Sequence, residues 1–323
     1  MEKTEKIFVA GHGGLVGSAI CRELKRQGYT NLVVRTHAEL DLTDSASVLD
    51  FFEQEKPEYV VLAAAKVGGI LANDSYPADF IRENLKIQTS VIDASYRNGV
   101  KRLLFLGSSC IYPRLAPQPI KEEYLLTGPL EPTNRAYALA KIAGIEMCWS
   151  YNRQYGTKYL AAMPTNMYGP GDNFDLNGSH VLPALMRKVF EAKRAGEKKL
   201  MVWGTGKPRR EFLYSDDLAE ACVHLLNLPD SRYDSLLNRS DPPLINIGTG
   251  EDLTIRELAE LVARIQDFDC ELVFDSSRQD GTPRKLLDVS RIHELGWKAK
   301  VSLEEGIRRT FASAEAQFEL TAR

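Results

Sequence analysis

The segment Ile7-Phe8-Val9-Ala10-Gly11-His12-Gly13-Gly14-Leu15-Val16-Gly17 decides the fold that we expect for this chain. Four apolar residues predict a buried strand, and glycines with the spacing GxxGxxG follow it before a helical pattern. Glycine permits a tight turn and lets backbone amides approach a pyrophosphate, while the helix N-terminus adds a partial positive charge. Any strand-to-helix turn can use glycines, but the strand, the helix and the N-terminal position agree on a dinucleotide site. We expect its cofactor contacts to include Gly11, Gly13, Gly14, Leu15, Val16 and Gly17.

Short apolar runs alternate with helical patterns through the first half of the chain. Most of these runs are continuously apolar, as expected of strands whose two faces are both covered by helices. The alternation predicts an α/β fold built on a doubly wound, parallel, Rossmann-like sheet. The expected strands span residues 6–10, 31–35, 59–64, 102–107 and 158–163, and the expected helices span 16–27, 45–55, 78–97 and 134–155.

The second half of the chain is less regular and predicts a smaller α/β substrate-binding lobe. Ser215-Asp216-Asp217 is expected to cap a helix that runs to about residue 227. Residues 228–243 are rich in Pro, Asp, Ser and Asn, which predicts a surface loop. The expected nucleotide-binding domain comprises residues 1–175 with returns near 211–227 and 244–265, and the expected substrate lobe comprises 176–210 and 270–323.

The end of the second expected strand bears on the choice of cofactor. An acidic residue there would accept a hydrogen bond from the ribose 2′-hydroxyl of NAD. This chain has Arg35-Thr36-His37 instead. A guanidinium suits a 2′-phosphate, which a carboxylate would repel. The segment therefore favours NADP(H), with a solvated arginine at a strand end as the alternative.

Tyr137 and Lys141 are four residues apart in an expected helix, so their side chains share one face. A free phenol has a pKa of about 10, and a nearby ammonium is expected to lower this pKa. Ser108 follows the expected strand 102–107 at the carboxyl edge of the sheet, where its hydroxyl can hold a substrate carbonyl oxygen. A YxxxK pair is common by chance, but with the serine and the glycine loop it predicts a carbonyl reductase.

Composition and charge exclude several classes of partner. The 323 residues carry a net charge of −3, which gives no reason to expect a nucleic acid or an anionic membrane as partner. Residues 1–6 are polar, the apolar run after them is too short for a signal peptide, and no window approaches membrane-spanning length. We therefore expect a cytoplasmic protein. The 5 cysteines are widely spaced and form no CxxC pair, so we expect neither disulfides nor a metal site.

Longer segments of the sequence resemble a known enzyme family. They are AAAKVGGI at 63–70, LGSSCIYP at 106–113, LEPTN at 130–134, MPTNMYGP at 163–170, REFL at 210–213 and DGTPRK at 280–285. They span nearly the whole chain in a consistent order, and several are too long for a chance match. On these segments the chain resembles the extended short-chain dehydrogenase/reductase family, and within it the bifunctional 3,5-epimerases/4-reductases that act on GDP-4-keto-6-deoxy-D-mannose.

The resemblance implies an activity and roles for individual residues. The activity would be 3,5-epimerisation of GDP-4-keto-6-deoxy-D-mannose, followed by NADPH-dependent reduction of the 4-keto group to give GDP-L-fucose. Cys110 would be the base and His180 the acid of the epimerisation. The catalytic residues of the reduction would be Ser108, Tyr137 and Lys141. A cysteine thiol and a histidine imidazole suit the proton transfers of the epimerisation because both groups titrate near neutral pH.

The resemblance also implies ligand contacts and a homodimer. Gly13 stands where family members often have an arginine that helps to bind the 2′-phosphate, although Arg35 remains. Lys188 follows Arg187, and either could reach a diphosphate. Dimers of the family usually pair two long helices per subunit, here 78–97 and 134–155. The implied cofactor contacts are Arg35, Ala64, Leu106, Gly107, Lys141, Pro164, Thr165, Asn166, Met167 and His180, and the implied substrate contacts are Asn166, Lys188, Trp203, Arg210 and Asp280.

Several alternatives stay open from the sequence. A 4,6-dehydratase usually has an Asp-Glu pair directly after its active hydroxyl residue, where this chain has Ser109-Cys110. A nucleotide-sugar 4-epimerase or 4-reductase would need neither Cys110 nor His180, and a free cysteine is more often a small buried apolar residue. An NADP-binding regulatory protein without catalysis would typically have lost part of the Ser-Tyr-Lys triad, which is complete here.

Overall fold

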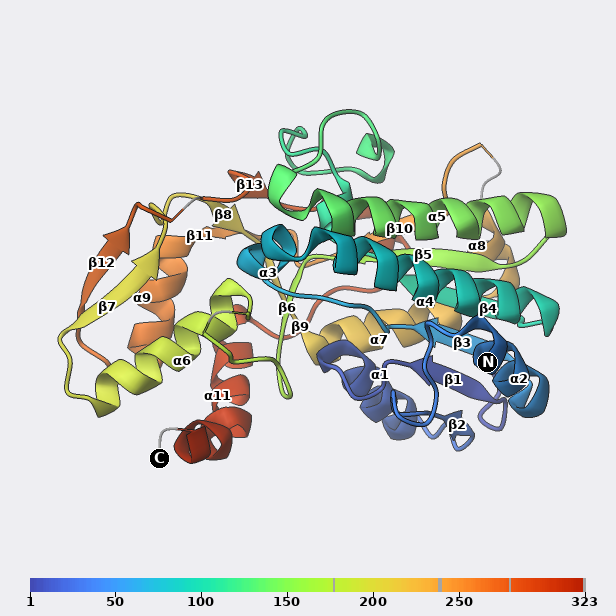
Figure 1. The fold of residues 1–323 in the computed structure, drawn as a ribbon, viewed down its shortest axis with the longest axis horizontal. Coiled ribbons are helices and arrows are strands. Elements are labelled where there is room, and N and C mark those ends of the chain that lie inside the picture. Colours follow the sequence, from blue (N-terminus) through green and yellow to red (C-terminus); the bar gives the residue numbers. More distant parts are fainter. Residues whose placement is uncertain (177, 238–239, 279, 322–323) are drawn as a thin grey trace.

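The computed structural model describes residues 1–323 except 177, 238–239, 279 and 322–323. It has a larger lobe built on a parallel sheet and a smaller lobe beside it (Figure 1). A separate cluster of buried apolar side chains fills each lobe. Among the helices of the described residues, none combines the length and the apolarity needed to cross a membrane.

The central sheet of the larger lobe has the strand order β10-β5-β4-β3-β1-β2, and every neighbouring pair is parallel. Its strands are almost entirely buried, because helices cover both faces of the sheet. From β1 the chain adds β2 on one side and then crosses to add β3 on the other side of β1. The boundary between β1 and β3 is therefore a topological switch point, where ligands bind in such sheets. The strands are β1 (Ile7–Ala10), β2 (Leu32–Val33), β3 (Tyr59–Leu62), β4 (Arg102–Leu106), β5 (Tyr159–Pro164) and β10 (Leu244–Ile247).

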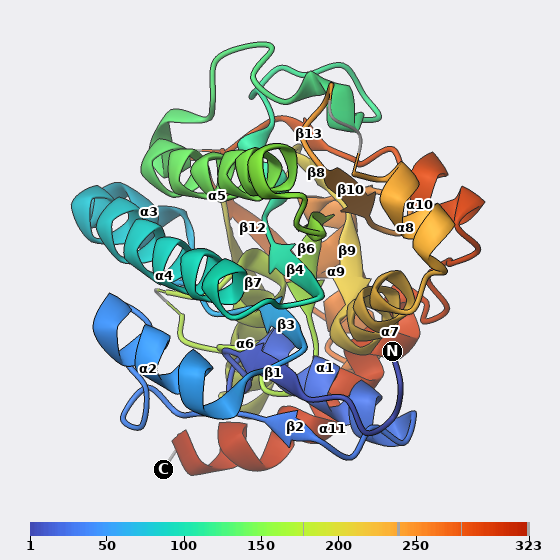
Figure 2. The same cartoon turned by 90° about the vertical axis from the view of Figure 1, so that its right-hand side faces the viewer.

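Two groups of helices sandwich the sheet (Figure 2). The first group packs together on one face, with α4 in contact with both α2 and α5. On the other face α1 packs against α7. The parallel, doubly wound α/β fold expected from the sequence is thereby confirmed. The helices are α1 (Leu15–Arg26), α2 (Ser45–Glu55), α4 (Pro77–Arg97), α5 (Arg135–Tyr155) and α7 (Ser215–Leu226), and a short α3 (Ile70–Ser75) precedes α4.

The smaller lobe combines helices with short strands. Helices α6 (Val181–Arg194), α9 (Ile255–Ile265) and α11 (Leu303–Thr321) pack on one another. The division into domains at the residue numbers given above stays a prediction. The strands outside the central sheet are β6 (Asn166–Tyr168), β7 (Lys199–Trp203), β8 (Arg209–Arg210), β9 (Phe212–Tyr214), β11 (Leu253–Thr254), β12 (Glu271–Asp275) and β13 (Arg284–Lys285), and α10 (Ser290–Glu294) follows them.

The expected cap of α7 is wrong. Tyr214 is the N-cap residue and makes no side-chain capping bond, while Ser215 is already helical and buried. The carboxylate of Asp217 instead accepts hydrogen bonds from the amides of Lys300 and Val301, each at 2.9 Å. A carboxylate near a helix start can accept from any amide within reach, and here it binds two amides of a distant segment.

The expected loop over residues 228–243 contains a helical turn, α8 (Asp230–Ser235). Its Tyr233 is buried, and the guanidinium of Arg102 lies 4.0 Å from the centre of the Tyr233 ring. Arg102 also donates to the carbonyl oxygen of Leu226 at 2.7 Å and to the carboxylate of Asp230 at 2.7 Å. These tertiary contacts stabilise a turn whose composition alone favours a loop.

Candidate active site

The glycine loop packs tightly against the end of β3. Gly11 has φ 88°, and a Cβ there would lie 2.6 Å from the backbone nitrogen of Ala64. At Gly17 a Cβ would lie 2.1 Å from the carbonyl oxygen of Gly11, whereas at Gly13 it would meet no atom within 4 Å. His12 in the same loop has a buried Nδ1 with no partner among the described residues. The loop thus has the close backbone approach that a dinucleotide pyrophosphate requires.

Gly17→Ala should destabilise the fold, because the new methyl group meets a backbone oxygen that has no room to move. We expect the free energy of unfolding to fall by about 1–3 kcal/mol, as is typical of overpacked sites. Gly13→Ala in the same loop is the matched control, since its Cβ meets open space. Urea unfolding of the two variants checks this, and equal midpoints would contradict the packing argument.

Ser108, Tyr137 and Lys141 meet at the carboxyl edge of the sheet. Ser108 follows β4, and its Oγ accepts a hydrogen bond from the amide of Cys110 at 3.3 Å. Tyr137 is half-buried at the start of α5, lies near the Ser108 hydroxyl, and contacts the ring of Phe80 edge to face. The ammonium of Lys141 is buried and donates to the carbonyl oxygen of Leu106 at 2.8 Å. The predicted triad is therefore brought together.

The charges of this group differ from those expected. The pKa of Tyr137 is raised by burial and by the nearby Cys110, and the polar hydroxyl of Ser108 opposes this rise only in part. Burial lowers the pKa of Lys141 to about 7. The prediction that the ammonium lowers the phenol pKa is wrong for this structure, because the Nζ atom lies 5.8 Å from the ring centre and is bound to a backbone oxygen. Tyr137 is consequently a protonated phenol at neutral pH, the form that donates a proton.

Cys110 lies in a 3-10 turn (Ser109–Ile111) after Ser108, with hydrogen-bond donors around its sulfur. Asn134 Nδ2 is 3.2 Å from the sulfur and Lys285 Nζ is 3.5 Å from it. Sequence reasoning assigned no role to either donor, although both belong to the segments that resemble the family. A small enclosed cavity adjoins the thiol and is also lined by Glu131 and Thr282.

His180 is the N-cap residue of α6 in the smaller lobe. Its side chain is exposed to solvent on one side, although many protein atoms surround it. This desolvation, together with the positive charge of Lys285, lowers the pKa of His180. The imidazole and Cys110 thus lie on different lobes, and both are close enough to Lys285 to interact with its charge.

Lys188 and Trp203 form a pair on the smaller lobe. The ammonium of Lys188 lies 4.5 Å from the centre of the Trp203 ring and donates to the carbonyl oxygen of Met201. The guanidinium of Arg278, which sequence reasoning missed, lies 4.8 Å from the same ring. Arg187 instead is buried and pairs with a glutamate of its own helix. The structure therefore places Lys188, and not Arg187, beside the exposed tryptophan.

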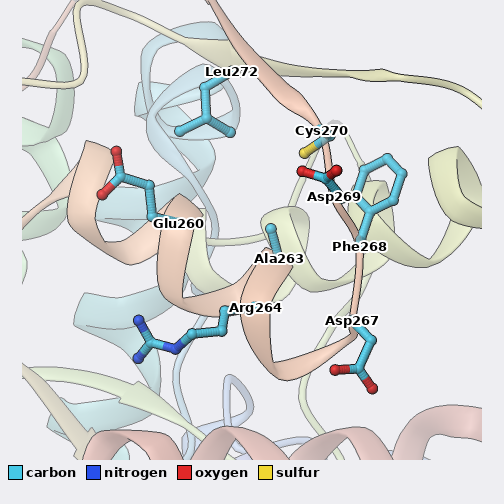
Figure 3. Close-up of a pocket in the computed structure, with 8 residues that line it drawn as sticks. All are labelled: Glu260, Ala263, Arg264, Asp267, Phe268, Asp269, Cys270 and Leu272. Atoms are coloured by element: carbon cyan, nitrogen blue, oxygen red, sulfur yellow. The ribbon is translucent and has the colours of Figure 1, made fainter.

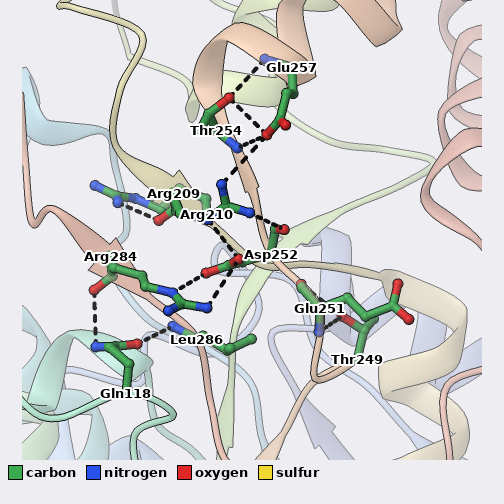
Figure 4. A network of polar contacts seen from close by, with 10 residues as sticks. All are labelled: Gln118, Arg209, Arg210, Thr249, Glu251, Asp252, Thr254, Glu257, Arg284 and Leu286. Atoms are coloured by element: carbon green, nitrogen blue, oxygen red, sulfur yellow. Dashed lines mark hydrogen bonds and ion pairs between the residues drawn. The ribbon is translucent and has the colours of Figure 1, made fainter.

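A salt-bridge network orients the strands that bear Arg210 (Figure 4). Asp252 accepts hydrogen bonds from Arg209 at 2.9 Å and from Arg284 at 2.6 Å, which joins β8 to β13. Successive residues of a strand point to opposite faces, so Arg210 and Lys285, which are register partners, share the face away from Asp252. Burial lowers the pKa of Arg210, and the nearby Cys110 and the carboxylate of Asp280 oppose that shift. Asp280 itself accepts from the amide and the hydroxyl of Thr205.

Residues 164–167, at the carboxyl end of β5, are held in place by hydrogen bonds to the buried residue Glu211. Thr165 Oγ1 and Asn166 Nδ2 both donate to the carbonyl oxygen of Glu211, at 3.2 and 2.7 Å. The fully buried side chain of Glu211 accepts from the amides of Thr249, Gly250 and Leu287. These bonds fix the backbone at the carboxyl end of β5, beside β4 and the Ser108 that follows it, at the edge of the sheet where ligands bind in this kind of fold.

Arg35 lies beyond the end of β2 and is engaged within the protein. Its Nη2 donates to Glu55 Oε1 at 2.6 Å, and its guanidinium lies 5.3 Å from the ring centre of Phe51. Glu55 also pairs with Lys6 at 3.2 Å. The cation predicted to hold a 2′-phosphate is thus near the glycine-loop side of the sheet, but it is paired with a carboxylate of α2.

A hollow outside this region lies on the smaller lobe, between the end of α9 and the start of β12 (Figure 3). Glu260, Arg264 and Cys270 line it, together with apolar side chains, and no residue of the predicted site does so. Among the described residues, no group of three or more His, Cys, Asp or Glu side chains is arranged to hold a metal ion.

Comparisons with known proteins agree with this geometry. Residues 7–248 match the model of the NAD dependent epimerase/dehydratase family. The chain belongs to this family. It is similar to GDP-L-fucose synthase 1 of Arabidopsis thaliana, with 60% identity over 96% of this chain and 93% of that protein. It is also similar to the GDP-L-fucose synthase of Escherichia coli strain K12, with 54% identity over 95% of each chain.

Solved members of the family share the whole architecture. The GDP-D-glycero-L-gluco-heptose synthase of Campylobacter jejuni, whose crystals were obtained in the presence of NADPH, is 41% identical to this chain. Its TM-score is 0.90, and the match covers 98% of this chain and 99% of that one. The resemblance stated from the sequence is therefore confirmed at the level of the family and of the fold.

Proposed function

We propose that this chain is a GDP-L-fucose synthase, which converts GDP-4-keto-6-deoxy-D-mannose to GDP-L-fucose with NADPH as reductant. The observation that carries the proposal is the position of Ser108 between two different proton-transfer groups. Its Oγ accepts a hydrogen bond from the amide of Cys110 at 3.3 Å, and its hydroxyl is close enough to the phenol of Tyr137 to affect the pKa of that phenol. One sugar ring at this edge of the sheet can therefore meet a thiol and a phenol in turn.

The first stage is epimerisation at carbons three and five. The 4-keto group acidifies the hydrogens on both carbons, since the electron pair left behind moves into the carbonyl as an enolate. Cys110 removes the proton from one face of the ring, and His180, on the opposite lobe, supplies a proton to the other face. Ser108 and Tyr137 stabilise the enolate oxygen by hydrogen bonds.

The second stage is reduction of the 4-keto group. When bound, NADPH supplies the hydride that reaches carbon four. Tyr137, a protonated phenol at neutral pH, donates the proton to the oxygen on that carbon. Lys141, held on the carbonyl of Leu106, keeps the start of α5 against β4 and so fixes the position of the phenol.

Both ligands have candidate contacts along the same edge. The pair Lys188–Trp203 suits a nucleotide, because an aromatic face and an ammonium can bind a base and a diphosphate. The GDP-sugar contacts that we propose are Asn166, Lys188, Trp203, Arg210 and Asp280. The cofactor contacts that we propose are Gly11, Gly13, Gly14, Leu15, Val16, Gly17, Arg35, Ala64, Leu106, Gly107, Lys141, Pro164, Thr165, Asn166, Met167 and His180.

Glu55→Gln should tighten the binding of NADPH, since it releases Arg35 from its ion pair. We expect the Kd for NADPH to fall by about twofold to fivefold, the range of a partly exposed ion pair. The Kd for NADH, which has no 2′-phosphate, should not change. Nicotinamide fluorescence titration of both dinucleotides checks the prediction, and a parallel change for NADH would show that Arg35 does not read the phosphate.

Related activities are the main alternatives. The similar heptose enzyme of Campylobacter jejuni indicates that this fold also serves other GDP-sugars. The identity of 60% to a GDP-L-fucose synthase is higher than the 41% to that enzyme, which favours the 6-deoxy sugar. A simple 4-epimerase or 4-reductase leaves Cys110 and His180 without a role, and a protein without catalysis leaves the intact triad unexplained.

One experiment tests the proposed function. The purified protein is incubated with GDP-4-keto-6-deoxy-D-mannose and NADPH, and the product is analysed by NMR. We expect GDP-L-fucose, whose coupling constants report inversion at carbons three and five and a hydroxyl at carbon four. A sugar that is reduced at carbon four but not inverted at carbons three and five would identify a 4-reductase. If product formed only from a GDP-heptose, the substrate would be a GDP-heptose and not the 6-deoxy sugar.

We further propose a homodimer formed through α4 and α5. These two long helices pack on each other, and Tyr96 and Tyr155 stack at 4.1 Å between ring centres near their C-terminal ends. Both rings and the side chain of Leu139 on α5 keep exposed surface. Sedimentation of Leu139→Glu against the unchanged protein tests the interface. The cytoplasmic location stays a prediction.

A further inference from the structure

Two hydrogen-bond donors converge on the sulfur of Cys110 from different parts of the chain. Asn134 Nδ2 lies 3.2 Å and Lys285 Nζ 3.5 Å from the sulfur, while the amide oxygen Asn134 Oδ1 is buried without a partner among the described residues. A neutral thiol is only a weak acceptor, whereas a thiolate accepts strong hydrogen bonds. The arrangement therefore suits the ionised sulfur better than the protonated one.

We propose that Lys285 is a positioning residue that holds Cys110 as a thiolate, ready to remove a proton from the sugar ring. The inference rests on the proposed function, in which Cys110 is the base of the epimerisation. Lys285 does not exchange its own proton in this role. It keeps an ammonium beside the sulfur, and Asn134 adds a neutral donor from another side.

The fold delivers Lys285 to this place by strand pairing. β13 lies parallel to β8, with Lys285 opposite Arg210 and Arg284 opposite Arg209. Asp252 binds both Arg209 and Arg284, which anchors one face of the pair (Figure 4). Because strand residues alternate between faces, the anchor turns Lys285 toward the carboxyl edge where Cys110 lies.

The other charges near the sulfur are either more distant or compensated. Arg210 is close enough to Cys110 for an electrostatic interaction but makes no hydrogen bond to its sulfur among the described residues, and it donates to the carbonyl oxygen of Arg209. Glu131 lines the same cavity and pairs with Arg114 at 3.1 Å. Tyr137 is protonated at neutral pH, and the pKa of His180 is lowered partly by Lys285 itself. Within the described part of the chain, Lys285 is thus the cation in hydrogen-bond range of the sulfur.

The proton balance of the step is simple. The thiolate forms an S–H bond as the C–H bond at carbon three or five breaks, and the electron pair moves into the enolate. The imidazolium of His180 then forms a C–H bond on the opposite face and becomes a neutral imidazole. Burial and, to a smaller extent, the nearby ammonium of Lys285 lower the pKa of His180, so its imidazolium gives up a proton more readily than a free one. Solvent returns a proton from the thiol to the imidazole before the next cycle.

The test measures alkylation of Cys110 by iodoacetamide at pH 7 in the full-length protein, with no sugar present. Iodoacetamide is neutral, so removing the charge of Lys285 does not change the electrostatic attraction of the reagent to the site. It reacts with the thiolate form of cysteine. Lys285→Met should slow alkylation of Cys110 by about fivefold to tenfold, because fewer sulfurs are ionised. Lys285→Gln should behave in the same way and replaces the methionine variant if that one does not fold. Lys285→Arg should restore most of the rate.

Two controls separate a charge effect from a structural one. Peptide mass spectrometry follows Cys270 in the same sample, and its rate should not change, since this half-buried cysteine lies in the other hollow. Lys121→Met removes an equal charge from an exposed site and should leave Cys110 unaffected. A Cys110 rate within twofold of the unchanged protein in the methionine and glutamine variants would overturn the inference. If the alkylation rates changed as expected in the Lys285 variants but the unchanged protein formed no GDP-L-fucose, the result would reject the proposed substrate and leave the role of Lys285 intact.

Discussion

Tyr137→Phe should abolish most of the reduction of the 4-keto sugar. The phenol is the protonated group beside Ser108, and loss of a positioned general acid lowers a rate by about 10²- to 10⁴-fold. The measurement is single-turnover NADPH oxidation with the keto sugar bound. Tyr155→Phe at the far end of the same helix is the matched control, since that hydroxyl lies at an exposed position.

The same variant should still exchange the hydrogens at carbons three and five with deuterium from the solvent. Cys110 and His180 are intact, and Ser108 still donates a hydrogen bond to the enolate oxygen. NADPH should bind as before. If reduction continued at the normal rate, Tyr137 would not be the proton donor. A loss of exchange equal to the loss of reduction would mean instead that the phenol serves both stages equally.

Cys110→Ser should suppress that exchange by about 10²- to 10⁴-fold, which is the contribution expected of one general base. A serine hydroxyl occupies nearly the same space, but it does not ionise near neutral pH and so cannot remove the proton. The change is followed by NMR of the keto sugar in deuterium oxide with NADPH omitted. Cys270→Ser is the matched control, because that thiol is remote from the triad.

Binding of NADPH to the Cys110→Ser protein should be unchanged, since the glycine loop and residues 164–167 remain in place. This readout distinguishes a lost base from a lost fold. Normal deuterium exchange in the serine variant would remove Cys110 from the mechanism. It would also remove the reason for Lys285 to carry a positive charge at 3.5 Å from the sulfur.

Local sequence was sufficient to predict most of the larger lobe. A buried strand in a parallel sheet is continuously apolar and a covering helix is amphipathic, so β1, β3, β4 and β5 could be located to within about two residues. Prediction failed where long-range contacts overrode composition. Arg102 stabilises α8 in a segment with loop composition, and the two-residue strands β8, β11 and β13 exist only through pairing with one another.

The sequence by itself also determined which reactive groups share one edge of the sheet, because Ser108 and Cys110 follow one strand and Tyr137 and Lys141 are one helical turn apart. Only the tertiary structure decided their electrostatic surroundings. Burial in the folded protein raises the pKa of Tyr137, and the fold places Lys188 rather than Arg187 beside Trp203. It also pairs Arg35 with Glu55 and brings Lys285 to the sulfur of Cys110. The reason is physical: covalent spacing sets which residues are neighbours along an element, whereas burial and charge depend on side chains that arrive from distant parts of the chain.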